Sequence, residues 1–96
     1  PPPTFSFFFF FISQKDFLGM IRKNNEVGVN KLFYKITAGS KVLTGEFSGN
    51  TAEIKGFVNL VAELQGIPNL NEIHVIVTDN NARVISDTNI PLKKLD

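Results

Sequence analysis

The chain has 96 residues and no cysteine, and its ten Lys or Arg against nine Asp or Glu give a formal net charge of +1. A chain of this length builds one hydrophobic core, which excludes a two-domain enzyme with a deep catalytic cavity. The missing cysteines exclude disulfides, thiolate nucleophiles and Cys-ligated metal sites. The longest apolar run, residues 7–12, is far shorter than the ~20 residues of a membrane helix, so we expect no membrane contact.

The charges are unevenly distributed along the chain. Residues 15–41 include six basic and two acidic side chains, whereas residues 42–92 include two basic and six acidic ones. One half is therefore suited to a polyanion and the other to solvent or protein. The alternative is a scatter of charges on a solvated surface.

The first predicted element is a strand over residues 5–13, because apolar side chains occupy both of its alternating faces. The two sets are Phe5, Phe7, Phe9 and Phe11 on one side and Phe8, Phe10 and Ile12 on the other. Both faces of this strand need to be shielded from water, and three arrangements would do so: burial within the sheet, contact with a neighbouring protein, and stacking of nucleic-acid bases on the Phe rings. Burial in the sheet is favoured.

Residues 16–23 fit either a short helix or a second strand. Ser13 and Asp16 have capping-box spacing, and Phe17, Met20 and Ile21 can line one face of a helix. The central Gly19 weakens the helix, so both alternatives stay open.

A strand is predicted over residues 31–38, with Leu32, Tyr34 and Ile36 on one face. Residues 39–49 follow with three glycines. They could form a hairpin partner, but the glycines favour a loop whose backbone can approach a ligand.

The helix that follows is predicted to open at Asn50, with Glu53 three residues later, and to end at Gly66 and Pro68. Its apolar stripe is Ile54, Phe57, Val58, Val61 and Leu64. A strand over residues 72–78, with Ile73, Val75 and Val77 inward, a turn at 79–81 and a short strand at 83–86 come next.

These elements predict a single α/β domain, in which the helix permits a right-handed crossover between parallel strands at 31–38 and 72–78. Residues 1–4 and 87–96 are expected to be extended tails around this one domain.

Catalytic chemistry is weakly indicated. His74 is the only histidine and lies within a strand pattern, where a structural role is favoured. Glu53 and Asp79 could converge at one sheet edge and hold Mg²⁺, and this part of the chain resembles ribonuclease H. The first-strand Asp of that family is replaced here by Ile12-Ser13. We therefore expect a non-enzyme without cofactor, metal or small-molecule substrate, and keep a nuclease as the alternative.

Two parts of the chain carry a family-like pattern: Thr37-Ala38-Gly39-Ser40, Leu43, Gly45 and Thr51 in the glycine-containing stretch, and Ile85-Ser86-Asp87-Thr88-Asn89-Ile90-Pro91 in the tail. Together they resemble the universal small-subunit ribosomal protein family eleven. The resemblance implies a ribonuclease H-like domain, shortened relative to the family, with a mixed sheet and one main helix. It also aligns residues 12–21 with a hairpin, which makes residues 16–23 a strand.

The implied function is a structural constituent of the small ribosomal subunit that binds platform rRNA and neighbouring ribosomal proteins. The mRNA path is a further candidate contact. The family is more basic and has a longer tail, so the chain is expected to be a divergent mitochondrial member, and a cytoplasmic ribosome is less favoured.

The candidate RNA contacts combine cations, hydroxyls and a glycine, the groups that bind phosphate and ribose. They are Lys15, Arg22, Lys23, Ser40, Lys41, Thr44, Gly45, Thr51, Arg83, Lys93 and Lys94. Two alternatives remain: surface lysines and loop glycines without a ligand, and a protein-only interaction module that dimerises through the Phe-rich strand.

Overall fold

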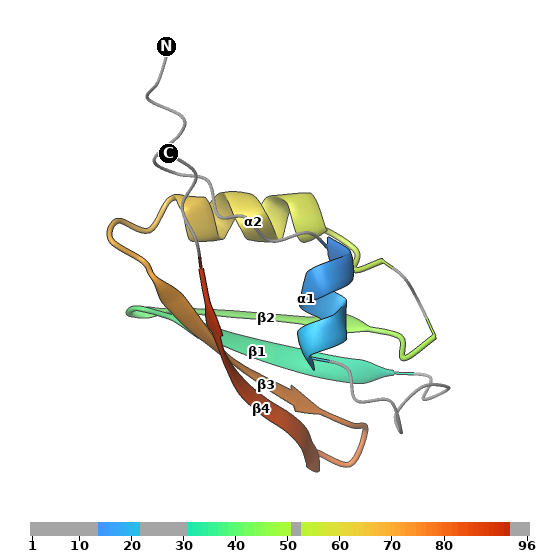
Figure 1. The fold of residues 1–96 in the computed structure, drawn as a ribbon. Helices are drawn as coiled ribbons and strands as arrows, with labels where there is room; N and C mark the ends of the chain where they lie inside the picture. The colour runs from blue at the N-terminus through green and yellow to red at the C-terminus, as the bar shows by residue number, and fades with distance from the viewer. Residues whose placement is uncertain (1–13, 22–30, 51–52, 93–96) are drawn as a thin grey trace.

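Two helices lie on one face of a four-stranded antiparallel sheet (Figure 1). The computed structural model describes residues 14–21, 31–50 and 53–92. The predicted strand at 5–13 and the tail at 1–4 lie outside the described residues. The elements, in chain order, are α1 (Gln14–Ile21), β1 (Leu32–Ala38), β2 (Lys41–Phe47), α2 (Phe57–Gln65), β3 (Glu72–Thr78) and β4 (Val84–Pro91).

The ambiguous segment before β1 is a helix as far as it is described. Phe17, Leu18 and Ile21 have helical spacing, and all three are buried in α1. Met20, expected on the same face, is 46% exposed. The strand implied by the ribosomal resemblance is therefore wrong over residues 16–21, because only a helix directs these three side chains into one core.

The sheet has the strand order β2-β1-β3-β4, and every neighbouring pair is antiparallel. The predicted mixed sheet, with a parallel crossover from β1 to β3, is therefore wrong. β2 reverses the chain before α2 begins, so the α2 crossover relates β3 to β2, and these two strands run in the same direction. β1 lies between them, and both of its pairings are antiparallel.

A two-residue turn at Gly39 and Ser40 joins β1 to β2, and Ala38 pairs with Lys41 across it. Gly39 has φ 63°, a left-handed conformation that favours glycine at the first position of such a turn. The stretch 39–49 is therefore mostly strand. The hairpin alternative is confirmed, and the open glycine loop is wrong.

α2 starts later than the sequence pattern indicates. Gly56 precedes it at φ 77°, so the residues from Glu53 to Gly56 are not helical. The helix ends at Gly66 as expected. Its buried side chains are Leu60 and Leu64, whereas Val58, expected on the apolar stripe, is 80% exposed.

β3 and β4 form a hairpin in which Ile73, Val75 and Val77 are buried as expected. β4 continues to Pro91, so residues 87–91, expected to be part of an extended tail, belong to the sheet. The register between β3 and β4 changes at one point: Val77 pairs with Ser86, but the next residue, Thr78, pairs with Val84. An irregularity of this kind, with an extra residue in one strand, is typical of a β-bulge, which bends the strand.

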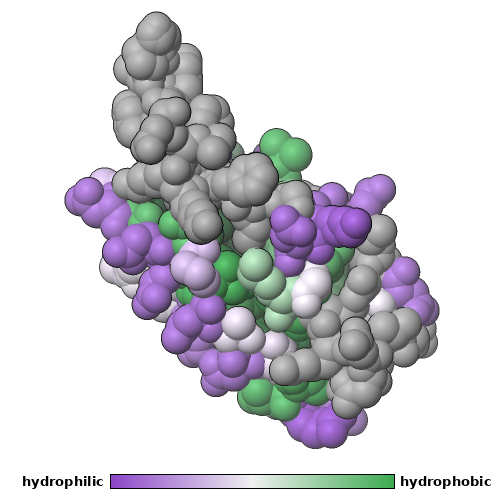
Figure 2. Space-filling model, viewed as in Figure 1, coloured by the Kyte–Doolittle hydropathy of each residue, from purple (hydrophilic) through white to green (hydrophobic). Residues whose placement is uncertain are grey.

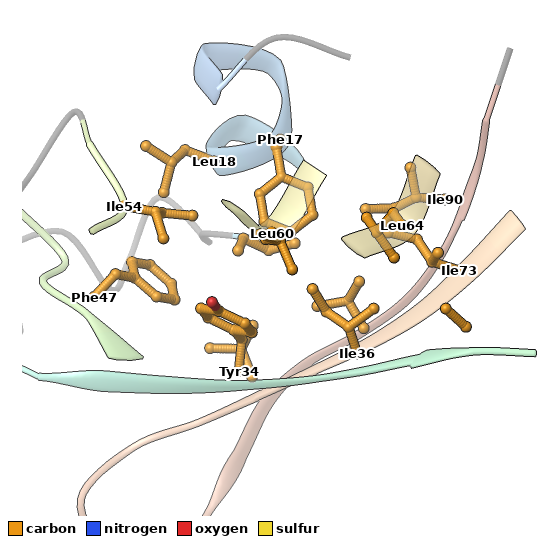
Figure 3. Packing of buried hydrophobic residues seen from close by; sticks show 14 of the residues in the cluster. Phe17, Leu18, Tyr34, Ile36, Phe47, Ile54, Leu60, Leu64, Ile73 and Ile90 are labelled. Atoms are coloured by element: carbon orange, nitrogen blue, oxygen red, sulfur yellow. The ribbon is translucent and has the colours of Figure 1, made fainter. Parts of the chain in front are cut away.

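The core lies between the helices and the inner face of the sheet. Phe17 and Leu18 of α1 and Leu60 and Leu64 of α2 meet the side chains of β1, β3 and β4 there (Figure 3). The Phe17 ring lies 5.9 Å from the Phe57 ring, which joins the two helices.

Tyr34 and Gly45 form a cross-strand pair on this inner face. The buried Tyr34 ring occupies the space that a Cβ on Gly45 would need, and it lies 6.4 Å from the Phe47 ring. Gly45 is therefore required by packing: an aromatic ring covers the backbone of the neighbouring strand.

Replacing Gly45 by Ala is expected to lower the free energy of unfolding by about 1–3 kcal/mol, because the new methyl group overpacks against the Tyr34 ring. Urea denaturation measures the change. The matched control is Gly19→Ala in α1, where a Cβ meets nothing within 4 Å and helix propensity gains ~0.5–1 kcal/mol. In a Tyr34→Val background the cost of Gly45→Ala should shrink. Equal stability of wild type and Gly45→Ala would contradict the packing.

Candidate binding face

The sheet face opposite the helices, called here the outer face, carries the alternate residues of all four strands. Its members are Phe33, Lys35 and Thr37 of β1; Val42, Thr44 and Glu46 of β2; Glu72, His74, Ile76 and Thr78 of β3; and Val84, Asp87, Asn89 and Pro91 of β4. Side chains alternate between faces along a strand, so each buried core residue places its neighbour here.

Apolar side chains on the outer face remain accessible. Val42 is 52% and Val84 56% exposed, and Phe33 and Ile76 are half-buried. Figure 2 shows hydrophobic surface between hydrophilic groups on the side of the molecule seen in Figure 1. A partner that covers this face would bury these accessible apolar groups.

A groove of about 440 Å³ lies at the centre of the outer face. It is lined by Phe33, Tyr34, Lys35, Thr44, Gly45, Glu46, Ile76 and Thr78. The groove combines an apolar surface with one ammonium, one carboxylate and two hydroxyl groups.

One ion pair and one histidine–carboxylate contact lie on this face. Lys31 Nζ is 3.4 Å from Glu46 Oε2, and His74 Nε2 contacts Asp87 Oδ1 across β3 and β4. His74 lies within β3, as the sequence pattern predicts. Lys35 has no ion-pair partner within residues 14–21, 31–50 and 53–92.

The candidate RNA contacts are dispersed over the described fold. Lys15 lies on α1, Ser40 in the β1–β2 turn, and Thr44 on the outer face. Arg83 lies in the β3–β4 turn, at the opposite end of the sheet from Ser40. The remaining candidates lie outside the described residues: Arg22, Lys23, Thr51, Lys93 and Lys94.

Two of these cations already face carboxylates. Lys41 contacts Glu63 of α2, and Arg83 Nε donates to Asp79 Oδ2 at 3.1 Å. Gly45 lies against Tyr34 in the core, where burial raises the pKa of the Tyr34 hydroxyl above 10.0. These residues have structural partners, so the positive field expected of an RNA contact is reduced.

Of the two alternative metal ligands, Glu53 and Asp79, the Asp79 carboxylate is already hydrogen-bonded. Both carboxylate oxygens of Asp79 accept hydrogen bonds: Oδ1 from the main-chain N–H groups of Asn81 and Arg83, and Oδ2 from the Arg83 side chain. Glu53 lies in the segment before α2. Among the described residues, no three His, Asp or Glu side chains gather closely enough to hold a metal ion.

Sequence motifs do not identify the outer face as a site. The alternation in β1 placed Phe33, Lys35 and Thr37 together, but only the antiparallel register brings Thr44 and Ile76 beside Lys35. Because the sequence pattern indicated a loop at Thr44 and a parallel β3, that surface could not be assembled.

None of the helices in the described segments is long and apolar enough to cross a membrane. In comparisons with known proteins, no family model, curated protein or solved structure matched the chain. The ribosomal resemblance and the mitochondrial location therefore stay predictions.

The Asp79 carboxylate should make stability depend on pH. Hydrogen bonds from the main-chain N–H groups of Arg83 and Asn81 hold the pKa of Asp79 below its ordinary value of 3.8. A carboxyl whose pKa is lower in the folded state stabilises the fold above its ordinary pKa, and that contribution is lost as pH falls. The stability difference between wild type and Asp79→Asn should therefore be largest near neutral pH and shrink below pH 3.8.

Urea titrations of both proteins from about pH 7 down to about pH 2 measure this difference. A constant difference across the range would show that the charge of Asp79 does not support the turn.

Proposed function

We propose that the protein is a non-catalytic binding domain that docks onto a larger assembly through the outer face of its sheet. The observation that carries the proposal is the contrast between the two faces. α1 and α2 cover the inner face, whereas the outer face presents accessible Val42 and Val84 around a groove lined by Phe33 and Ile76.

The chemistry of the outer face favours binding over catalysis. A shallow sheet surface leaves reacting groups in contact with water. Efficient catalysis by general acid–base or nucleophilic groups needs a site from which water is excluded. Fully burying an apolar side chain such as Val contributes about 1.5–3 kcal/mol, so covering a few of these residues stabilises a complex.

Replacing Phe33 by Thr is expected to release the protein from its native assembly, because the substitution removes the aromatic wall of the groove and keeps a residue that favours strands. Sedimentation of the full-length tagged protein from its own cells measures the assembled fraction. The matched control is Val58→Thr on α2, which also changes an exposed apolar residue, but away from the outer face.

We expect Phe33→Thr to move to slowly sedimenting fractions while wild type and Val58→Thr remain assembled. Thermal unfolding of each variant checks that the domain is intact. Equal sedimentation of all three folded proteins would contradict docking through the outer face.

We infer the small ribosomal subunit as a second, more specific candidate for that assembly. Its support is the sequence resemblance together with the exposure of the Gly39–Ser40 turn, which an RNA-contacting turn requires. The described residues contribute several cations to internal ion pairs, so this role would depend on ribosomal-protein contacts as well as rRNA. The ribonuclease H-like fold belongs to the same candidate, although the antiparallel β1–β3 pair gives it no support.

If this candidate is correct, the protein co-sediments with small subunits and is stripped by high salt, because salt weakens phosphate contacts. Ser40→Glu should lower the bound fraction by placing a carboxylate in the exposed turn. Ser40→Ala is the control without added charge. Failure to co-sediment, or equal binding of both variants, would exclude the turn as an rRNA contact.

A further inference from the structure

The groove at the centre of the outer face has a definite chemical character. Phe33 and Ile76 provide its apolar surface, and Thr44 and Thr78 provide hydroxyl groups on either side of Lys35. Its volume of about 440 Å³ is comparable to pockets that hold small ligands or a few side chains.

The uncompensated charge in this groove is positive. Glu46 also lines it, but Lys31 lies 3.4 Å from that carboxylate. Lys35 projects from the middle of β1 and has no ion-pair partner among the residues described. A ligand that covers Lys35 must therefore supply an anion, because burying an unpaired ammonium group is costly.

We propose that the groove binds a polypeptide segment in which one Asp or Glu is flanked by aromatic or aliphatic residues. The ligand carboxylate pairs with the Lys35 ammonium, and its apolar neighbours pack on Phe33 and Ile76. This inference rests on the proposed docking function and specifies the partner's chemistry.

The charges around the groove favour polypeptide over nucleic acid. A nucleic-acid strand carries a phosphate at every nucleotide, whereas the described lining of the groove offers one cation without an ion-pair partner, Lys35. That cation matches a ligand with a single negative charge and leaves the further phosphates of a nucleic-acid strand without partners.

The charges also disfavour the chain's own Phe-rich segment. Residues 5–12 contain no carboxylate, so that segment would cover Lys35 without neutralising it. A second copy of the domain, facing the first, is the other source of a carboxylate for Lys35, through Glu46 or Asp87 of the partner copy.

Nuclear magnetic resonance titration of the full-length ¹⁵N-labelled protein tests the proposal with three blocked pentapeptides, SFEIS, SFQIS and SFKIS. SFEIS should shift the amide signals of Lys35, Thr44 and Ile76. SFQIS should bind about fivefold more weakly, the upper range for a partly exposed ion pair. Lys35→Glu should reverse the preference, so that SFKIS binds better than SFEIS. Lys55→Glu, at an exposed position before α2, should keep the wild-type preference.

Several results would overturn the proposal. Equal affinity for SFEIS and SFQIS, or no reversal in Lys35→Glu, would show that Lys35 does not select the ligand. Tighter binding of hexauridylate than of SFEIS would indicate nucleic acid, and a concentration-dependent dimer that buries the same amides would indicate a second copy.

A negative result with the peptides does not by itself contradict the proposed docking function. If Phe33→Thr releases the native assembly while the peptides show no charge preference, the outer face docks but the inferred ligand is wrong. If Phe33→Thr has no effect on assembly, the docking function itself fails.

Discussion

Burial of one sheet face beneath two short helices is the constraint on which the rest of the structure depends. Neither α1 nor α2 is long enough to be stable alone in water, and both are held by side chains such as Phe17 and Leu64 that enter the core. The strands supply the other half of this core through alternate residues, including Ile36 and Val75, which are fully buried. Helix stability and strand register are therefore determined together.

The same constraint determines which residues lie on the outer face. With a side-chain period of two, Tyr34 and Ile36 cannot enter the core without Phe33 and Lys35 facing away. The antiparallel register then sets Thr44 and Ile76 beside Lys35. A candidate binding surface thus follows from pairings between strands distant in sequence.

Some elements were predictable because their signals are local. Alternation in β1 and β3 identified both strands and their buried residues, and Gly66 with Pro68 marked the end of α2. The start of α2 was not predictable from its apolar spacing, because Gly56 in a left-handed conformation interrupts the pattern after Ile54.

The errors in topology and site have one origin, the hairpin of β1 and β2. Treating residues 39–49 as a loop left β1 free to pair in parallel with β3, and it left Gly45 and Lys41 free to meet a ligand. In the fold, the Tyr34 ring lies over Gly45, and Lys41 faces Glu63 of α2. These contacts join residues more than ten positions apart, which neither motif spacing nor glycine content specifies.

The most direct test of the account is the solvent accessibility of methyl groups on the two sheet faces in the monomeric full-length protein. A soluble paramagnetic probe should strongly broaden the methyl signals of Val42 and Val84, and leave those of Ile36 and Val75 sharp. Equal protection of all four residues would show that the outer face is already covered within the protein, and would contradict its role as a docking surface.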